Sequence, residues 1–547
     1  MLQRRLPAAL TPFTRLACPP ATSTATVALP RSHQSTFTAS PSPSAPHPFP
    51  AGDSGHSAPH HHGDIDFCDT STSFKHKSSL ELARSATIFN LCKVKPLVQN
   101  ASKLIGCTRK VAGDQLTDWA LKQTFFKQFC GGEQLSDLHN TMAALSSHGV
   151  GSILDYAAEK DLHSPSSTVS PSDINAELDI NCHHTIDALR ASQAQTAKGY
   201  AAVKLTSLAT PQLLVKVSDV VRDMEAAFDA FIGVSTGEDR NTASLDRVTF
   251  AKKAAEVWGA GEWGEAFDKV AKDGRLGYAQ FMGEFGPCGE HYGGAGLSEA
   301  EREEWAKVVE RVGRVAAECE ALGSVSVLID AEQTYMQPAI EYVTLQAMRT
   351  HNKERAVVYN TYQGYLKKCE ERLLLGIAQA HAEGFHLGVK LVRGAYMYQE
   401  RRLAAEKGYE DPICRSLEDT HASYDGCVAH ILDSLHRIEV VLGTHNEQSI
   451  KKAVAGLHLR GLSPTSPRVA FAQLLGMCDH ITFKLGASGF AAYKYVPYGP
   501  IKEVLPYLLR RAEENSDLLG SSGKETLLIL QELAGRSLHL QPRRRFA

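Results

Sequence analysis

Val325-Ser326-Val327-Leu328-Ile329-Asp330 is a short apolar run, rich in β-branched residues, that ends on a carboxylate. Comparable runs occupy residues 356–360 and 387–392, and segments of helical length separate them. Further runs of this kind lie at 149–154, 201–206, 438–443, 469–471 and 493–496. A strand followed by a helix, repeated about eight times, is typical of parallel α/β proteins. Because no G-x-G-x-x-G turn follows the first run, the pattern favours a closed (β/α)8 TIM-like barrel over an open dinucleotide-binding sheet.

The segments on either side of this repeat differ from it in composition. Residues 1–50 contain arginine, many Ser, Thr, Ala and Pro, and no acidic residue. This composition is typical of a mitochondrial transit peptide, and a merely disordered tail is the alternative. We expect a linker at 51–79, an N-terminal helical region at 80–145, and the barrel at 146–520 with an insertion at about 235–296. A C-terminal helix and tail are expected at 521–547.

Charge and cysteine content exclude several classes of protein. The 547-residue chain has a net charge of −3, so composition gives no reason to expect nucleic acid as a partner. Its 12 cysteines include no C-x-x-C pair, which favours reduced thiols over a disulfide framework or a zinc site. No apolar run of about 18 residues occurs, so no transmembrane helix is expected. Asp268–Leu276 resembles a calcium loop, but its glycine comes one place late and key carboxylates are missing, so no metal site is predicted.

Polar residues interrupt or end several of the apolar runs. Functional side chains of a barrel stand at the C-terminal ends of its strands, where such residues would converge. A lysine inside a strand is costly to bury without an anion, so Lys204 and Lys390 imply partners such as Asp330, a cofactor or a substrate carboxylate. Each residue alone could instead be a satisfied core group or a rim residue. The full set is Lys204, Asp330, Gln363, Lys390, Thr444, His445 and Asn446.

Two adjacent arginines, Arg510 and Arg511, lie on a predicted helix whose apolar face includes Val504 and Leu508. Neighbouring side chains on a helix diverge by about 100°, so one arginine must turn toward the packed side. A buried guanidinium needs an anion, and its planar fork fits a carboxylate. The alternative is a solvated pair in which Arg510 bonds Glu514 one turn later.

Ordered blocks of sequence resemble proline dehydrogenase, and most closely the eukaryotic mitochondrial single-function enzymes. The blocks cover most of residues 149–518, except the insertion at 235–296. They include Asp330–Tyr335, Asn360–Lys367, Lys390–Tyr396, Gly408–Pro412, Gly443–Asn446, Gln473–Asp479, Tyr493–Gly499 and Leu508–Asn515. The resemblance implies oxidation of L-proline to Δ1-pyrroline-5-carboxylate in a (β/α)8 barrel. It also implies non-covalent FAD, hydride transfer to flavin N5, and electrons passed to ubiquinone.

The resemblance assigns roles to individual residues. It implies that Arg510 and Arg511 bind the proline carboxylate, while Lys204 and Asp330 form the polar catalytic wall. Leu474 and Tyr495 would pack on the proline ring, and Glu159 would close the site. The residues implied to bind the cofactor are Gln363, Lys390, Val392, Arg393, Gly394, Tyr396, Thr444, His445, Asn446 and Glu514. Lys390 stands where the bacterial bifunctional enzymes have arginine, so it can supply charge but no bidentate contact.

Two other functions compete with this interpretation. The first is a 4-hydroxyproline dehydrogenase, which the bulk of Tyr495 disfavours because it would exclude a ring hydroxyl. The second is an inactive barrel that serves as a binding protein, which predicts erosion of the arginine pair, Lys204 or Asp330; none is eroded. The resemblance further implies a mitochondrial location, with peripheral contact to the matrix side of the inner membrane.

Overall fold

A computed structural model describes residues 65–157, 170–193, 198–233, 240, 243–259, 261–287, 289, 296–517 and 521–540. The predicted transit peptide, residues 51–64 of the predicted linker, and Glu159 lie outside the described residues.

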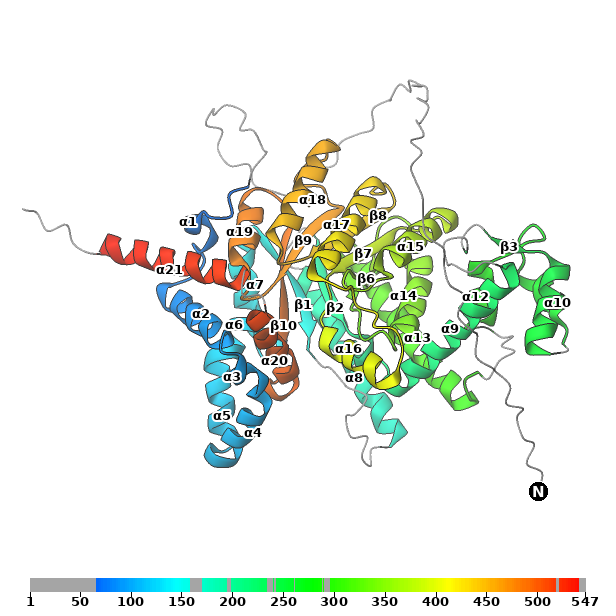
Figure 1. Cartoon of the computed structure of the whole chain (residues 1–547), viewed down its shortest axis with the longest axis horizontal. Coiled ribbons are helices and arrows are strands. Elements are labelled where there is room, and N and C mark those ends of the chain that lie inside the picture. The colour runs from blue at the N-terminus through cyan, green and yellow to red at the C-terminus, as the bar shows by residue number, and fades with distance from the viewer. Residues whose placement is uncertain are drawn as a thin grey trace, which may run out of the picture. The chain divides into compact units, whose positions relative to one another are not determined.

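Eight parallel strands close into a barrel, which confirms the predicted fold class (Figure 1). Around the barrel the strands follow the order β1, β10, β9, β8, β7, β6, β5, β2. Their bounds are β1 Val150–Tyr156, β2 Gly199–Val203, β5 Val325–Ile329, β6 Val358–Gln363, β7 Leu387–Val392, β8 Ile438–Gly443, β9 Val469–Leu474 and β10 Ala492–Tyr498. Nearly every strand residue is buried, as expected when helices cover the outside and side chains fill the inside.

Helices surround the strands (Figure 1). All but α20, which follows the last strand, lie in the connections between consecutive barrel strands, as the alternating sequence pattern predicts. Their bounds are α8 Pro171–Gln193, α9 Pro211–Ile232, α13 Glu299–Leu322, α14 Gln337–His351, α15 Cys369–Glu383, α16 Met397–Lys407, α17 Leu417–Asp433, α18 Glu447–Leu459, α19 Asp479–Ala487 and α20 Ile501–Asp517.

Strand boundaries differ from the prediction at two places that matter for the site. The run at 201–206 was expected to be a strand, but β2 ends at Val203, so Lys204 stands just past its C-terminal end. Strand β6 begins at Val358 and reaches Gln363, so Gln363 ends the strand. Both shifts have one cause: burial alone cannot fix where the hydrogen-bonded ladder begins and ends. Both also place the polar side chain at the C-terminal mouth of the barrel.

An N-terminal group of helices packs against the barrel beside α20. Their bounds are α1 Thr70–Ser73, α2 Ser79–Cys92, α3 Lys95–Gln99, α4 Ala101–Ala112, α5 Asp114–Leu121, a π-helical turn Lys122–Phe126, α6 Lys127–Phe129, a 3-10 turn Leu135–Asp137 and α7 Leu138–Ser146. The C-terminal helix α21 (Ser521–Leu540) lies along α2. Buried Leu82, Phe89 and Phe129 join Tyr507 and Leu508 of α20 in one apolar cluster. Folding of this group is therefore coupled to the placement of α20.

The insertion at 235–296 forms a small helical unit at the end of α9. It contains β3 (Ser244–Leu245), α10 (Arg247–Trp258), α11 (Trp263–Val270), β4 (Leu276–Gly277) and α12 (Tyr278–Phe285), and Leu245 pairs with Leu276 across an antiparallel bridge. Stacked aromatic rings, among them Phe250, Phe281 and Trp258, fill its core. In the stretch that resembles a calcium loop, Asp268 binds Arg247 at 2.9 Å instead.

Candidate active site

Asp330 is the centre of a buried charged cluster at the C-terminal mouth of the barrel. Its carboxylate accepts from Lys390 Nζ at 2.6 Å, from Lys204 Nζ at 3.2 Å and from Tyr495 OH at 2.8 Å. These residues lie in or directly after β2, β5, β7 and β10, strands that are far apart in sequence. The structure thus brings together four residues that sequence reasoning placed at the site, and each is at most 8% exposed.

The electrostatics of the cluster keep Asp330 ionised. Burial by itself would raise the pKa of Asp330, but Lys390 and Lys204 outweigh burial and hold the pKa at about 2. Burial, together with Asp155 and Asp330, raises the pKa of Tyr495, so its hydroxyl stays protonated and donates to Asp330. A carboxylate that stays ionised presents a constant negative charge to whatever binds at the mouth.

Asp155 is a member of the cluster that sequence reasoning did not assign. It lies near the end of β1, is fully buried, and its Oδ2 is 3.5 Å from Lys204 Nζ. The predicted strand at 149–154 ended one residue earlier, so Asp155 was assigned no role. Asp155 could have been identified by the same sequence feature as Asp330, because both are carboxylates at the end of an apolar run.

Arg510 and Arg511 lie on α20, which directly follows β10. Arg511 is 4% exposed, binds Glu514 at 2.5 Å and packs over the Tyr507 ring at 4.7 Å. Arg510 is only half-buried and lies 5.7 Å from the centre of the Tyr396 ring. Glu514 therefore pairs with the buried Arg511, a contact that the surface alternative did not include.

The arginine pair borders the same region as Asp155. Burial raises the pKa of Tyr507, Arg511 lowers it, and Asp155 raises it, so both charges lie within electrostatic range of one hydroxyl. Tyr396, which Arg510 faces, follows β7 and its Lys390. The helix that carries the arginines also follows directly on β10, the strand that contributes Tyr495 to the Asp330 cluster.

Arg393 forms a second cationic centre, in the loop after β7. Its guanidinium donates to Thr444 Oγ1, to Ser449 Oγ at 2.8 Å and to His421 Nδ1 at 3.2 Å. The guanidinium also stacks 4.3 Å above the Tyr424 ring, and burial lowers its pKa. Among the described residues no carboxylate lies within ion-pair distance of Arg393. A half-buried arginine with neutral partners can bind an anionic ligand group.

Backbone geometry next to Arg393 requires a glycine, because the Tyr365 ring packs directly on the main chain. Gly394 has φ of 129°, and a Cβ there would lie 2.4 Å from the Tyr365 ring, so only glycine fits. The Val392 carbonyl accepts from the Gly364 N–H at 2.7 Å. Gln363 donates to the Glu332 carbonyl at 3.0 Å, and this bond holds its side chain at the end of β6. Gln363 and Val392, both predicted to bind the cofactor, lie in register on the neighbouring strands β6 and β7.

His445 and Asn446 line a cavity of about 220 Å³ at the end of β8, together with Glu447, His480 and Lys524. Burial, assisted by Lys494, Arg511 and Arg393, lowers the pKa of His445 to about 3, so the ring is neutral. Its Nε2 accepts from the Leu474 N–H at 3.1 Å, and this bond assigns the ring proton to Nδ1. Asn446 caps α18, because its Oδ1 accepts from the Ser449 N–H.

Comparison with known proteins identifies the family to which this arrangement belongs. A family model described as proline dehydrogenase matches residues 138–522. Proline dehydrogenase 1, mitochondrial, of Caenorhabditis elegans is 32% identical over 86% of this chain and 88% of its own, and the Homo sapiens protein of that name is 32% identical over 86% and 90%. This chain belongs to the proline dehydrogenase family. It is therefore an oxidoreductase with a TIM-like barrel.

Two further matches add to that assignment. Hydroxyproline dehydrogenase of Xenopus laevis is also 32% identical, over 87% of this chain and 91% of its own. Proline utilization A from Bdellovibrio bacteriovorus aligns with a TM-score of 0.52 and 15% identity, and this likeness shows the fold alone. The structural alignment covers 83% of the present chain and 38% of the Bdellovibrio chain. No helix of the described residues has the length and apolar character that a bilayer span needs.

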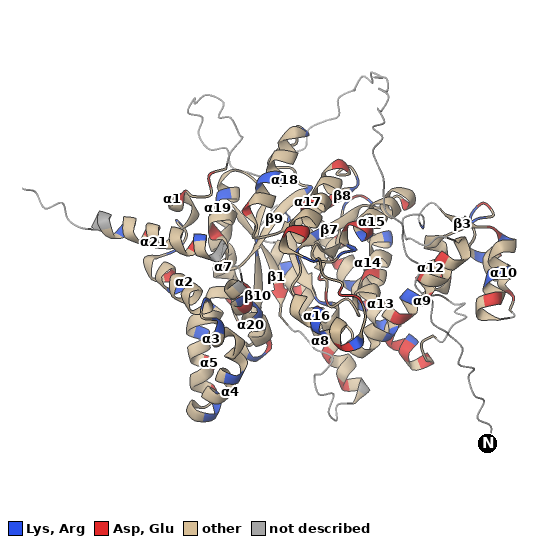
Figure 2. Cartoon of the chain, in the orientation of Figure 1, with Lys and Arg blue, Asp and Glu red and all other residues tan. Residues whose placement is uncertain are grey.

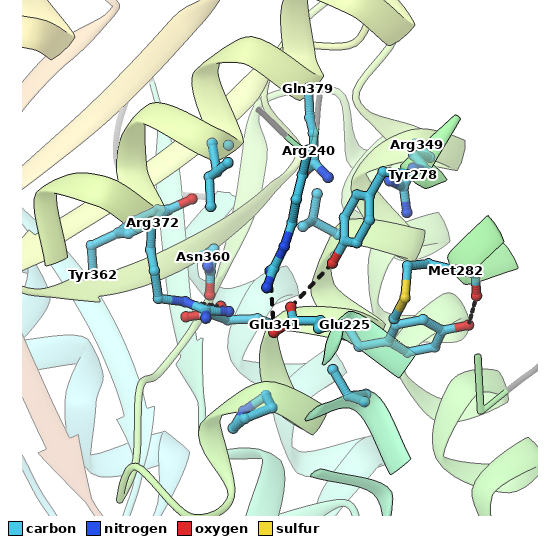
Figure 3. A pocket seen from close by; sticks show the side chains of 16 residues that line it. Glu225, Arg240, Tyr278, Met282, Glu341, Arg349, Asn360, Tyr362, Arg372 and Gln379 are labelled. Atoms are coloured by element: carbon cyan, nitrogen blue, oxygen red, sulfur yellow. Dashed lines mark hydrogen bonds and ion pairs between the residues drawn. The ribbon is translucent and has the colours of Figure 1, made fainter. Parts of the chain in front are cut away.

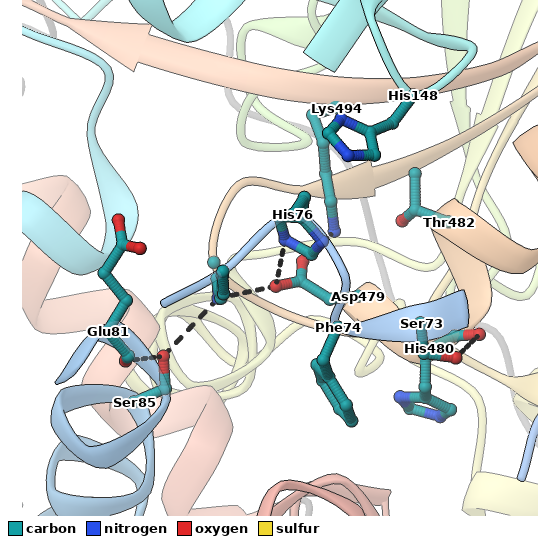
Figure 4. A network of polar contacts seen from close by, with 12 residues as sticks. Ser73, Phe74, His76, Glu81, Ser85, His148, Asp479, His480, Thr482 and Lys494 are labelled. Carbon is teal, nitrogen blue, oxygen red and sulfur yellow. Dashed lines mark hydrogen bonds and ion pairs between the residues drawn. The ribbon is translucent and has the colours of Figure 1, made fainter. Parts of the chain in front are cut away.

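A buried network around Asp479 and Lys494 (Figure 4) supports the turn that follows β9, the strand that ends at Leu474. Asp479 binds Lys494 Nζ at 2.8 Å and Lys77 Nζ at 2.6 Å, while Lys494 also donates to the Met477 carbonyl. Lys494 reaches the Leu474 carbonyl at 3.3 Å. The network ties the segment before α2 to the turn between β9 and α19, and sequence reasoning did not anticipate it.

A second cavity lies outside the barrel (Figure 3). It holds about 60 Å³ between the insertion and the outer barrel helices α14 and α15. Its charges are mutually compensated: Arg372 pairs with Glu341, Arg240 lies 3.4 Å from Glu225, and Tyr278 OH donates to Glu225 at 3.1 Å. These contacts join the insertion to the barrel and do not involve the mouth.

Proposed function

We propose that the protein oxidises L-proline to Δ1-pyrroline-5-carboxylate with bound FAD. The observation that carries this proposal is the buried Asp330 cluster at the barrel mouth, with paired arginines on α20, the helix that directly follows β10 and its Tyr495. An amino acid with a carboxylate and a ring nitrogen needs an anion-binding fork and an anionic wall, and this mouth offers both. Membership in the proline dehydrogenase family supports the same chemistry.

Each side chain has a distinct task in this proposal. Arg510 and Arg511 bind the proline carboxylate and fix the orientation of the ring. Lys204 and Asp330 form the polar wall next to the ring nitrogen, and Lys390 holds the Asp330 carboxylate in place at 2.6 Å. Leu474 and Tyr495 contact the ring carbons and exclude water from them. Glu159, which lies outside the described residues, would pair with an arginine and close the site.

The lining of β6, β7 and β8 fits FAD. Arg393 suits a pyrophosphate, because its half-buried guanidinium has neutral side-chain partners and no carboxylate partner among the described residues. The cavity of about 220 Å³ at His445 and Asn446 suits the adenosine end, with Thr444 beside it. Gln363, Lys390 and Tyr396 would contact the isoalloxazine, and Glu514 a cofactor hydroxyl. When bound, FAD supplies the two-electron acceptor for the hydride that leaves the ring carbon next to nitrogen.

The electron acceptor and the location follow from the same proposal. We infer that ubiquinone receives the electrons, with the enzyme at the matrix side of the inner mitochondrial membrane. The relatives named mitochondrial and the acid-free, arginine-containing residues 1–50 support this location.

The test is the absorbance spectrum of the purified protein. We expect flavin bands that L-proline bleaches under anaerobic conditions and that return when a quinone is added. If the protein shows no flavin absorbance after purification, and none after incubation with FAD and removal of the free cofactor, the proposal is refuted. D-proline serves as the matched control, because its carboxylate would leave the arginine pair when the ring occupies the same place.

A second candidate substrate is 4-hydroxyproline. The relative named hydroxyproline dehydrogenase is as similar to this chain as the named proline dehydrogenases are, at 32% identity. The position of Tyr495 at the mouth favours proline, because its ring would oppose a hydroxyl on C4. The ratio of kcat/KM for the two substrates decides between them, and a ratio that favours hydroxyproline would overturn the assignment.

A further inference from the structure

Residues 91–121, here called the docking hairpin, gather exposed apolar side chains at one place. Of the 18 large hydrophobic residues exposed in the described chain, seven lie in these residues: Leu91, Val94, Leu97, Leu104, Val111, Leu116 and Trp119. Val111 is 84% exposed and Trp119 is 59% exposed. Soluble proteins seldom expose apolar side chains in such density unless the surface binds something.

The hairpin stands out from the barrel, so its surface is accessible (Figure 1). No residue of α4 is buried. Gly113, with φ of 81°, makes the turn between α4 and α5, and Arg109 binds Asp118 at 2.8 Å across the two helices. Leu104 and Val111 are seven residues apart and so share one face of α4, while Leu116 and Trp119 share one face of α5.

The charge of the hairpin is opposite to that of the chain as a whole. Residues 91–121 contain five basic and two acidic side chains, whereas the whole chain has a net charge of −3. Asp118 is neutralised by Arg109, while Lys95, Lys103 and Lys110 are exposed without an ion pair among the described residues. Blue residues are visible along α3 and α4 in Figure 2.

Exposed leucine, valine and tryptophan interspersed with lysine match one kind of partner, the surface of an anionic bilayer. Apolar side chains enter the boundary between headgroups and acyl chains, tryptophan is favoured at that depth, and lysine binds the lipid phosphates. A protein groove of the same apolar character would not require the lysine excess.

We propose that the docking hairpin binds the enzyme to an anionic membrane surface through Val111, Leu116 and Trp119, with its lysines on the headgroups. Val98 of α3 belongs to the same apolar cluster as Tyr507 and Leu508 of α20, the helix that carries Arg510 and Arg511. Docking thereby fixes α20 and the barrel mouth at the membrane. The benefit to catalysis rests on the proposed quinone acceptor, which dissolves in the bilayer.

The test measures co-sedimentation of the flavin-loaded enzyme with phosphatidylcholine vesicles that contain about one third anionic phospholipid. A variant with Val111→Gln, Leu116→Gln and Trp119→Gln should bind at least about 30-fold more weakly. Lys103→Glu with Lys110→Glu should weaken binding by about 10-fold or more on the anionic vesicles and leave the weak binding to neutral vesicles unchanged.

Matched controls change the same residue types elsewhere. Val248→Gln with Leu459→Gln removes two exposed apolar side chains, and Lys353→Glu with Lys407→Glu reverses two exposed charges. Both controls should bind vesicles as the wild type does. Circular dichroism and the Tm of every variant identify any that fails to fold, and the lysine variant tests the same surface without touching an apolar side chain.

Activity separates this proposal from the proposed function. Hairpin variants should retain proline-dependent bleaching and turnover with a water-soluble quinone, and lose turnover with a long-chain quinone in vesicles. If proline bleaches no variant and no wild type, the proposed function fails and the hairpin is judged on sedimentation alone. Wild-type vesicle binding by a folded apolar variant overturns docking. So does a change in oligomeric state without a change in vesicle binding, which would make the hairpin a contact between copies.

Discussion

Two buried lysine–carboxylate clusters lie at opposite ends of the same barrel. At the mouth, Asp330 binds Lys204, Lys390 and Tyr495. At the other end, Glu439 pairs with Lys198, accepts from Tyr359 OH at 3.1 Å and accepts from the Ala356 N–H at 2.9 Å. Neither the sequence nor the burial of the charged side chains shows which of the two clusters belongs to an active site.

The difference between the clusters lies in what surrounds them. Around Glu439 the neighbours are tyrosine rings that close the barrel floor: Tyr200 packs edge-on against Tyr359 and Tyr493. Around Asp330 a second lysine and a second carboxylate converge from separate strands. The comparison teaches that burial of a charged pair is not sufficient to mark a site; convergence of more charged groups at the C-terminal ends of the strands is.

Replacement of Asp330 by Asn should have the largest effect on activity. The amide removes the negative charge that both lysines face, so the wall no longer matches the substrate, and kcat/KM should fall by about 10³-fold. Rapid-reaction measurement of flavin bleaching by proline gives the rate, and the flavin content of the purified variant is the control. If the variant kept the wild-type kcat/KM, the Asp330 cluster at the mouth would be no more important for catalysis than the Glu439 cluster at the opposite end of the barrel.

Arg511→Met should raise the KM for proline by about 10- to 100-fold, because a charged hydrogen bond contributes about 1.5–3 kcal/mol. Arg510→Met should act in the same direction. Flavin should remain bound in both, and Arg402→Met, on an exposed face of α16, should leave KM unchanged. An unchanged KM in both α20 variants would show that the carboxylate binds elsewhere.

The barrel could be predicted because its signal is repeated. Runs such as 325–330 and 387–392 are buried on both sides, and this burial leaves a pattern that survives error in any one element. The ends of strands carry no such signal. Lys204 was expected inside a strand and stands past the end of β2, because ladder hydrogen bonds, not hydrophobicity, decide where a strand stops.

The site could be predicted only in its parts. Asp330, Lys204, Lys390 and Tyr495 were each identifiable, and the structure supplies their common contact. Asp155 and the network of Asp479 with Lys77 and Lys494 were not anticipated. Lys77 and Asp479, for example, are 402 positions apart (479 − 77) and meet only through the fold. The roles of Glu159 and of the cofactor residues stay predictions.

Tyr495→Ser should change which substrate the mouth prefers. Removal of the ring would open space for a substituent on the proline C4. Loss of the phenol hydroxyl also removes a hydrogen-bond donor to Asp330. Proline should bind worse, and the ratio of kcat/KM for 4-hydroxyproline over proline should rise about tenfold. Tyr495→Phe is the control that removes the hydroxyl and keeps the ring. A ratio that does not change in the Ser variant would place the Tyr495 ring away from the substrate.

Glu439→Gln should have the smallest effect on activity, with kcat/KM unchanged, and a clear effect on stability. The amide leaves Lys198 as a buried cation without its carboxylate, which costs about 3 kcal/mol. Burial lowers the pKa of Lys198, and Glu439 opposes this effect. Without the Glu439 carboxylate, the charged form of Lys198 therefore loses its compensating partner, and the folded protein is destabilised.

The pH dependence of that loss carries a definite sign. Burial would raise the pKa of Glu439, but Lys198, the Ala356 N–H and Tyr359 OH lower it overall. A carboxyl whose pKa is lowered by folding stabilises the protein above its unfolded pKa, about 4.3, and loses that contribution as the pH falls through its folded pKa. The difference in unfolding free energy between wild type and Glu439→Gln should therefore be full at pH 7 and shrink below about pH 4. Urea unfolding at several pH values measures this difference in free energy. If the Glu439→Gln variant were as stable as the wild type but slow with proline, the Glu439 cluster would also belong to the active site.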